Sequence, residues 1–367
     1  MKKIYTLLLY ILLTNNYLLS ASSITLDEAI EILKINNLEI ESAALNVSYA
    51  KENEKTASGN NWGKLDFIQE FASSDDAGNV FGFKLASREA TFNDFGFSDF
   101  GTISNSTPPK DLNYPDSRDF FQSKVKYELP IFTGFKISSY TDVMKSMVTM
   151  KNLDKKQVIN EKIYQLRKSY YDMALLRNST KNLNTILTNI DTLENMTKQM
   201  IEVGYAKKVD LLEVQAKKGN VQRLILQMES NQKLLYHYIS FLLNQKIENI
   251  SMDSASVSMP LFTNEDVLSN NLDIQRASTG LEVRKSMVDV SKSSYYPMVG
   301  AFAEAATADD TFLGNADDHK AYTVGARLTW NIFNGGIDSA KVEKSRIQHI
   351  KTKTQVELAK KGIALKV

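Results

Sequence analysis

The stretch Leu129-Pro130-Ile131-Phe132-Thr133-Gly134 decides the fold, because a strand-like segment ends there and a very long helical segment begins. A related stretch, Trp330-Asn331-Ile332-Phe333-Asn334-Gly335-Gly336, lies at the same kind of boundary, with Phe333 following Phe132 by 201 positions. A motif that recurs in the same context indicates an internal duplication. The junction residues that we single out are Pro130, Phe132, Gly134, Phe333, Gly335 and Gly336.

Segments 64–72 and 121–129 precede the first junction and alternate between apolar and polar residues. This period of two predicts two strands, each with one apolar and one polar face. At about nine residues, each strand is long enough to cross a bilayer at a tilt. The predicted apolar face consists of Leu65, Phe67, Phe71, Phe121, Val125, Tyr127 and Leu129. Residues 72–120, between the strands, predict a partly ordered surface loop with clustered phenylalanines.

Residues 136–244 predict a long helical hairpin, since no proline occurs between Gly134 and Pro260 and the only glycines are Gly204 and Gly219. Apolar residues at heptad spacing on both arms indicate coiled-coil packing. In the first arm they are Leu183, Ile186, Ile190, Leu193 and Met200. In the second arm they are Val214, Val221, Met228, Leu235 and Leu242. A companion seam on the second arm consists of Leu211, Ile225 and Ile239, and Lys218 and Gln232 interrupt it. At 1.5 Å per residue the first arm would reach about 100 Å. The alternative is a compact bundle whose helix breaks around residues 178–184.

The turn of this hairpin is predicted near 204–210. Gly204 can adopt the left-handed conformation that closes the first helix, and Asp210 with Glu213 forms an acidic capping pair for the second. A connection this short favours an antiparallel pair of helices.

The second half of the chain repeats the plan. The stretch Asn270-Asn271-Leu272-Asp273-Ile274 corresponds to Asn36-Asn37-Leu38-Glu39-Ile40 at an offset of 234. The first helix is expected to break at Asn36-Asn37. Strands are predicted at 298–306 and 322–330. At an offset of 201, the apolar face of the last strand coincides with that of segment 121–129, except that Ser123 answers Val324. We place the first repeat at 23–245 and the second at 246–367, and expect the second to be incomplete, without its second turn and returning helix.

The N-terminus predicts a signal peptide at 1–22. Lys2 and Lys3 precede an apolar run that is too short to span a bilayer, and Ser20-Ala21-Ser22 offers small residues for cleavage. The alternative is an uncleaved anchor. Cysteine is absent, so disulfides, thiolate zinc sites and a lipid-modified cysteine are excluded. A formal net charge of +1 gives no reason to expect a nucleic-acid partner.

The order helix, strand, strand, long helix, turn, long helix resembles the TolC-like outer-membrane efflux protein family. The resemblance is carried by the duplicated junction, by Tyr295-Tyr296-Pro297 before a strand, and by Gly204…Asp210-Leu211-Leu212 followed by Val214 and Ala216. It implies an α+β membrane protein that is internally duplicated, with long antiparallel coiled-coil helices and four β-strands per subunit. In this family the strands of a homotrimer form one shared β-barrel, which agrees with the rule that unpaired strand edges are not tolerated in lipid.

The resemblance also implies a function, a location and partners. The function is a passive export duct in a tripartite efflux or type I secretion system, located in the outer membrane with its helices in the periplasm. The implied partners are outer-membrane lipid, a periplasmic adaptor and, through the adaptor, an inner-membrane pump. Candidate adaptor-docking residues are Gly204, Ala206, Asp210, Leu211 and Leu212; alternatively, Gly204 and Asp210 are only helix caps. The family's gate lies near the second turn, so we expect a 367-residue form to be unstable or inactive as a channel.

Residues for enzymatic chemistry are not apparent, and we expect no enzyme activity, cofactor or metal. None of the three histidines, His237, His319 and His349, has a second ligand at the spacing of a zinc helix. The acidic loop pairs Asp75-Asp76 and Asp309-Asp310 are more simply solvated charge than a cation site. A second hypothesis from a different class remains: a coiled-coil structural or adhesive envelope protein with its strands in a soluble sheet. An apolar face with an aromatic rim at Tyr322 and Trp330 favours the duct.

Overall fold

The computed structural model describes residues 23–104, 106–251, 263–312 and 319–366. The predicted signal peptide at 1–22 lies outside the described residues. The described residues form two compact units, one within the ranges 1–48 and 151–272 and the other within the ranges 49–150 and 273–367. Each unit is described separately.

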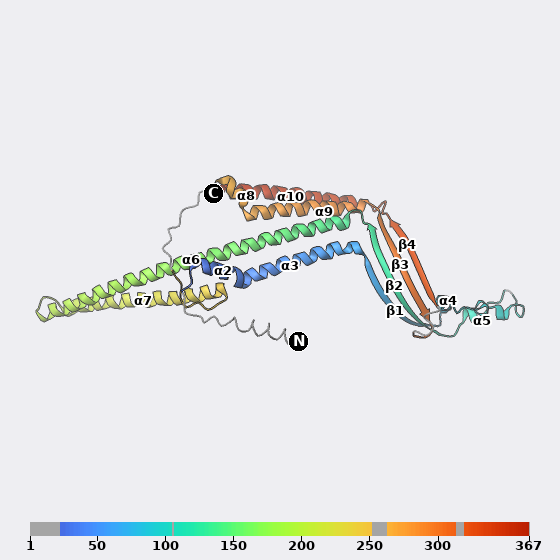
Figure 1. The fold of residues 1–367 in the computed structure, drawn as a ribbon, viewed down its shortest axis with the longest axis horizontal. Helices are drawn as coiled ribbons and strands as arrows, with labels where there is room; N and C mark the ends of the chain where they lie inside the picture. The colour runs from blue at the N-terminus through green and yellow to red at the C-terminus, as the bar shows by residue number, and fades with distance from the viewer. Residues whose placement is uncertain (1–22, 105, 252–262, 313–318, 367) are drawn as a thin grey trace, which may run out of the picture. The chain divides into compact units, whose positions relative to one another are not determined.

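The described chain is mostly helical and contains one four-stranded antiparallel sheet (Figure 1). The helices are α2 (Leu26–Asn36), α3 (Leu38–Gly59), α4 (Ala77–Ala86), α5 (Lys110–Asn113), α6 (Lys136–Glu202), α7 (Lys208–Leu243), α8 (Asn264–Asn270), α9 (Leu272–Lys292) and α10 (Ile337–Lys366). The strands are β1 (Lys64–Ser74), β2 (Arg118–Phe132), β3 (Met298–Asp309) and β4 (Lys320–Thr329). Single 3₁₀ turns lie at η1 (Asn60–Trp62), η2 (Phe92–Phe95), η3 (Phe97–Asp99) and η4 (Ser293–Tyr295).

The core of the first unit joins α2, α6 and α7. Its buried residues are Ala29, Ile30, Leu33, Ile40, Leu166, Tyr170, Met173, Ile239, Leu242, Leu243, Ile247 and Ile250. Thr25 and Glu28 form a capping box before α2. The predicted helix break occurs at Asn37, whose buried side chain donates to the Leu242 carbonyl at 2.8 Å and accepts from the Ile40 N–H at 3.1 Å. One asparagine therefore ends α2, caps α3 and ties both to α7.

The predicted hairpin is present as α6 and α7. The compact-bundle alternative is wrong, because α6 is continuous through residues 178–184. On α7, the seam residues Val214, Ile225, Ile239 and Leu242 are buried as predicted. On α6 the prediction is wrong for Ile186, Leu193 and Met200, which are exposed, whereas Glu194 and Thr197 are buried. A polar pairing between the arms, described below, turns this part of α6 away from its apolar heptad.

The sheet in the second unit runs in the order β1-β2-β3-β4 (Figure 1). Its two hairpins have the same register once the two sequence offsets are applied. Leu65 pairs with Tyr127 in the first hairpin, and the corresponding residues, Val299 and Leu328, pair in the second. The helix break also recurs, since Asn37 follows α2 and Asn271 follows α8 with nearly identical backbone angles. The internal duplication predicted from sequence is thus present in the backbone.

The segment between β1 and β2 is more ordered than predicted. It contains α4, whose first turn is capped by Asp76, and α5. Its phenylalanines cluster as expected: Phe81 contacts Phe95 edge-on, with ring centroids 5.0 Å apart, and Phe83 stacks on Phe120 of β2 at 4.2 Å. Stacking against the sheet anchors α4, a helix that is nearly all apolar and therefore shows no amphipathic period in the sequence.

Candidate functional site

The sheet has two chemically different faces, which are set by the alternation along each strand. In the register of the four strands, apolar residues of all strands fall on one face. This apolar face comprises Leu65, Phe67, Phe71, Phe121, Val125, Tyr127, Leu129, Val299, Ala301, Ala303, Ala305, Tyr322, Val324, Ala326 and Leu328. Many of these side chains are exposed, for example Tyr322 at 83% and Phe67 at 69%. The faces of β1, β2 and β4 agree with the sequence prediction, except that β4 ends at Thr329 and does not include Trp330.

A row of polar residues interrupts the apolar face, because Gln69, Ser123, Thr307 and Lys320 lie side by side on the four strands. Ser123, the polar exception identified from the sequence, lies directly opposite Gln69 on β1. Its hydroxyl donates to the Gln69 side-chain carbonyl at 2.6 Å. Each polar group therefore satisfies the other within the sheet, as polar groups away from water generally must.

The opposite face of the sheet is charged. Lys124 Nζ lies 3.1 Å from the Glu304 carboxylate of the neighbouring strand, and Lys126 Nζ lies 2.7 Å from Glu128. Arg327 of β4 sits over the Phe302 ring, with its guanidinium carbon 5.7 Å from the ring centroid. Charges of both signs thus alternate across this face, which suits contact with water rather than with lipid.

The first junction leaves the sheet through a bulge and a left-handed turn. The register of β2 against β3 shifts between Pro130 and Phe132, so Ile131 is the extra residue. Gly134 and Phe135 then both adopt positive φ, at 62° and 65°, immediately before α6. A Cβ on Gly134 would lie 2.6 Å from the Ser293 carbonyl oxygen of η4, so only glycine fits there.

Aromatic rings hold this junction together. Phe132 and Phe135 meet edge-on at 5.2 Å between centroids, and both contact Tyr296, which precedes β3, at 6.5 and 5.7 Å. The contacts explain why Phe135 keeps a conformation that is costly for a residue with a side chain. The sequence points to Phe132 but not to Phe135 and Tyr296 as its partners, because a left-handed phenylalanine has no sequence signature.

The second junction has the same backbone conformation as the first but lacks its contacts with neighbouring residues. Gly335 and Gly336 have positive φ of 67° and 81°, as the offset of 201 from Gly134 and Phe135 requires. Nothing lies within 4 Å of the position of a Cβ on either glycine. Phe333, the counterpart of Phe132, is 86% exposed. Within the described chain the same turn is therefore covered in one copy and open in the other.

The turn between α6 and α7 exposes apolar side chains next to its caps. Gly204 has a φ of 85°, and the N–H of Tyr205 donates to the Met200 carbonyl at 2.8 Å, which closes α6. Of the predicted docking residues, Gly204, Asp210 and Leu212 are exposed, whereas Ala206 and Leu211 are half-buried. Three further exposed apolar residues, Val203, Tyr205 and Val209, were missed in the sequence analysis because they lie outside the heptad pattern.

The predicted capping pair of Asp210 and Glu213 is wrong. Helix α7 begins one turn earlier than that pair implies, and the Asp210 carboxylate accepts the N–H of Lys207 at 2.8 Å. Glu213 instead forms an ion pair with Lys217 at 2.8 Å. Asp210 thus caps the helix from its third residue, where an acidic side chain reaches back to the free backbone donor.

A polar layer joins the arms of the hairpin. Lys218, the residue that interrupts the companion seam, lies 3.0 Å from Glu194 and 2.8 Å from Asp191 on α6. Glu194 also accepts from Lys198 and from Gln215, at 2.9 and 3.3 Å. Hydrogen bonds from Lys198, Lys218 and Gln215 lower the pKa of Glu194 to about 2. A polar layer in a coiled coil fixes the register of its helices.

We expect acid to weaken this layer in a defined range. Because the pKa of Glu194 is lowered from 4.5, its contribution to stability is complete above pH 4.5 and is lost as the pH falls toward about 2. Thermal unfolding of the helices, followed by far-ultraviolet circular dichroism, should show this loss. The variant Glu194→Gln should be less stable than wild type at pH 7 but no less stable near pH 2. If the two proteins lose stability in parallel over this range, the layer has no such role.

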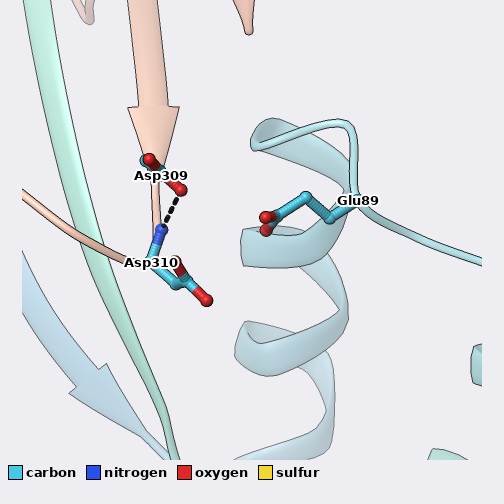
Figure 2. Close-up of side chains that lie close together, drawn as sticks. All are labelled: Glu89, Asp309 and Asp310. Carbon is cyan, nitrogen blue, oxygen red and sulfur yellow. Dashed lines mark hydrogen bonds between the residues drawn. The ribbon is translucent and has the colours of Figure 1, made fainter. Parts of the chain in front are cut away.

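One group of three carboxylates among the described residues is close enough to share a cation. Oxygens of Glu89, after α4, and of Asp309 and Asp310, at the end of β3, all lie within 4.8 Å of one another (Figure 2). Arg118 of β2 forms an ion pair with Glu89 and lies 3.6 Å from Asp310, and Asp309 accepts the N–H of Asp310 at 2.8 Å. The Arg118 guanidinium offsets part of the negative charge and joins Glu89 to Asp310, so we assign this cluster a structural role in holding α4 against the sheet.

The helices in the described ranges include none that combines the length and apolar character needed to span a membrane. No family model matches the chain, and no curated protein matches its sequence.

Solved structures share the fold. The chain superposes on the CusC channel with a TM-score of 0.71 at 13% identity, covering 92% of this chain and 74% of CusC. It superposes on the outer membrane protein VceC from Vibrio cholerae with a TM-score of 0.69 at 13% identity, covering 91% of this chain and 75% of VceC. It superposes on the CmeC outer membrane channel from Campylobacter jejuni with a TM-score of 0.70 at 12% identity, covering 91% of this chain and 67% of CmeC. CmeC is described as an outer membrane channel, VceC as an outer membrane protein and CusC by its transmembrane channel formation, and the chain has the TolC-like outer-membrane-factor fold of these structures.

Proposed function

We propose that this protein is the outer-membrane duct of an export system, which lets substrates pass without itself supplying energy. The observation that carries this proposal is the sheet, which is apolar on one face of all four strands, from the junction end up to the row of Gln69, Ser123, Thr307 and Lys320, while the opposite face is charged. Strands that cross a bilayer around an aqueous channel need such a division, with apolar residues toward lipid and polar residues toward water. Soluble proteins rarely leave a large apolar face of a sheet exposed.

The proposed assembly is a homotrimer whose strands close into one barrel, with the helical hairpin in the periplasm. Oligomerisation follows from the strand edges: in the described sheet, β1 and β4 each pair on one side only. Each unpaired backbone N–H or C=O group in lipid costs several kcal/mol. Summed along one strand edge, this cost is on the order of the free energy of unfolding of a small domain. A pump in the inner membrane would supply energy and selectivity through a periplasmic adaptor.

Cell fractionation tests this function. The protein, produced in a Gram-negative host with its signal segment, is expected in the outer-membrane fraction and to resist extraction with carbonate. A second arm measures accumulation of an exported dye in cells that lack their own duct. Recovery of folded protein only from the soluble periplasm would favour the structural or adhesive alternative and rule out the duct.

The exposed turn between α6 and α7 is proposed as the adaptor-docking surface. Asp210→Asn keeps an oxygen that can accept the Lys207 N–H but removes the charge, and Leu212→Ser removes an exposed apolar side chain. The assay measures cross-linking to the adaptor from a photoreactive group placed at Tyr205. We expect Leu212→Ser to reduce this cross-linking by about tenfold and Asp210→Asn to reduce it by less. Lys233→Ala, far along α7 from the turn, is the control and should have no effect. Unchanged cross-linking in both variants would leave Gly204 and Asp210 as caps only.

A further inference from the structure

The long segment between β1 and β2 contains a short tandem repeat. Phe92-Asn93-Asp94-Phe95-Gly96 is followed directly by Phe97-Ser98-Asp99-Phe100-Gly101, so the pattern Phe-polar-Asp-Phe-Gly occurs twice at an offset of five. The backbone repeats as well. The turns η2 and η3 follow one another, and each copy ends at a left-handed glycine, with φ of 83° at Gly96 and 87° at Gly101. The two aspartates therefore occupy equivalent positions in equivalent turns.

The first aspartate, Asp94, is engaged by its own chain. Its carboxylate forms an ion pair with Lys84 of α4 and accepts the hydroxyl and the N–H of Thr91, at 2.8 and 2.7 Å. The hydrogen bond from Lys84, together with those from Thr91, lowers the pKa of Asp94 to about 2. This copy of the repeat thus binds a primary ammonium group, the one at the end of the Lys84 side chain.

The second aspartate, Asp99, has neither partner. The offset of five replaces Thr91 by Gly96, which has no hydroxyl and whose N–H donates to the Asn93 carbonyl at 2.9 Å. It also replaces Lys84 by Glu89, which forms an ion pair with Arg118. In the part of the chain that the structure describes, no hydrogen bond or ion pair engages the Asp99 carboxylate. The second turn therefore presents its carboxylate without an internal cation.

Asp99 lies in an open cup of about 320 Å³ whose other lining residues include Phe95, Phe97, Phe100, Ile103 and Pro109. The Phe97 and Phe100 side chains are 55% and 73% exposed. Gly96 packs tightly against Pro109, because a Cβ on this glycine would lie 2.5 Å from the Pro109 Cβ, so the shape of the cup is fixed in advance. Aromatic rings beside a carboxylate suit an organic cation, since the rings attract the charge and cover the alkyl chain.

The surrounding segment has the charge that attracts a cation. Residues 75–117 contain seven acidic and three basic residues, which gives a net charge of −4 in a chain whose net charge is +1. An acidic surface of this kind raises the local concentration of cations. The segment joins the ends of β1 and β2 that lie opposite the first junction, so in the proposed duct it faces the outside of the cell.

We propose that Asp99, with Phe97 and Phe100, binds a primary alkylammonium group from outside the chain, as Asp94 binds that of Lys84. A free alkylamine and a lysine side chain of another polypeptide both present this group, as a compact charge on a flexible alkyl chain. The site goes beyond the proposed function and does not depend on it. Only the arrival of the ligand from the cell exterior rests on the duct.

The test is a titration of the full-length protein in detergent with n-propylammonium, followed by saturation-transfer difference NMR. We expect saturable binding with a dissociation constant on the order of 1–10 mM, because one ion pair and two ring contacts at a half-exposed site bind weakly. Asp99→Asn should weaken binding by about five- to tenfold and Phe100→Leu by about two- to fivefold. Asp111→Asn, which changes an exposed acid of the same segment outside the cup, is the matched control and should have no effect.

The equivalence of the two turns provides a second readout. Lys84→Ala removes from the Asp94 turn the same atoms that n-propylammonium contains, so this variant should bind a second molecule of the amine. Adding Asp94→Asn to it should return the protein to one site. The peptide acetyl-Gly-Lys-Gly-amide distinguishes the two sources of the ligand: affinity above that of n-propylammonium identifies a lysine side chain, and equal or lower affinity identifies a free amine.

Absence of saturable binding by the wild-type protein, or equal affinities of the Asp99→Asn and Asp111→Asn variants, would overturn the site. These measurements do not require insertion into a membrane. Protein that binds the amine in detergent but gives no conductance in a bilayer would therefore remove the duct and keep the site.

Discussion

Replacing Gly134 with alanine should destabilise the sheet unit well beyond the same change at a glycine with open space around it. The residue has a φ of 62°, which costs a residue with a Cβ about 1–2 kcal/mol. The new Cβ would also lie 2.6 Å from the backbone oxygen of Ser293, and forcing the two segments apart costs about 1–3 kcal/mol more. Because Phe135 is already left-handed, this turn has no spare freedom to relax.

The measurement is denaturant unfolding of detergent-solubilised protein followed by tryptophan fluorescence. The two tryptophans, Trp62 and Trp330, lie just before β1 and just after β4, so they report on the sheet. Gly101→Ala is the control, because Gly101 has a φ of 87° but no atom within 4 Å of the added Cβ. We expect a loss of about 1–2 kcal/mol for the control and about 2–5 kcal/mol for Gly134→Ala. Equal losses would mean that the close approach to Ser293 is not needed.

A single arginine should distinguish the two faces of the sheet. Ala305 and Ala306 are neighbours on the central strand β3, and their side chains lie on the apolar and the polar face respectively. Ala305→Arg should cost about 2–4 kcal/mol in folding from denaturant into lipid vesicles, because it places a charge toward lipid. Ala306→Arg should cost less, about 0.2–1 kcal/mol, because its charge stays in water on the polar face and only meets the like charge of Lys124 directly opposite, which Glu304 partly offsets.

The comparison keeps the strand, the original residue and the substitution the same, so only the face differs. Its outcome is measured as the fraction folded by heat-modifiable gel mobility and by fluorescence. A larger loss for Ala306→Arg would reverse the assignment of the faces. Similar small losses for both would indicate that neither face meets lipid, as in a soluble sheet.

Much of the architecture could be predicted from the sequence because the internal duplication presents the same pattern of strands and junction twice. The alternation in the strands predicted the faces, and the two offsets, 201 and 234, reproduce the register of the second hairpin from the first. The proline-free stretch after Gly134 likewise predicted α6 and α7. These features depend on local periodicity, which a single sequence carries in full.

The features that were missed depend on contacts distant in sequence. Helix α4 is held by the stacking of Phe83 on Phe120 and not by an amphipathic pattern. Phe135 is left-handed because Tyr296 and Phe132 hold its ring. The rotation of α6 near Glu194 reflects its ion pair with Lys218, which lies on the other arm of the hairpin.

The central claim, that the polar face of the sheet lines an aqueous duct through the outer membrane, is tested most directly by conductance. Because all four strands of the sheet are present, purified protein reconstituted into a planar bilayer is expected to give discrete ion-conducting steps, in place of the inactivity expected from the incomplete second repeat. Lys126→Glu, on the polar face of β2, should shift the reversal potential in a salt gradient toward cation selectivity. Protein that is folded and inserted in the bilayer but shows no conductance, or whose selectivity is unchanged by Lys126→Glu, would contradict the claim.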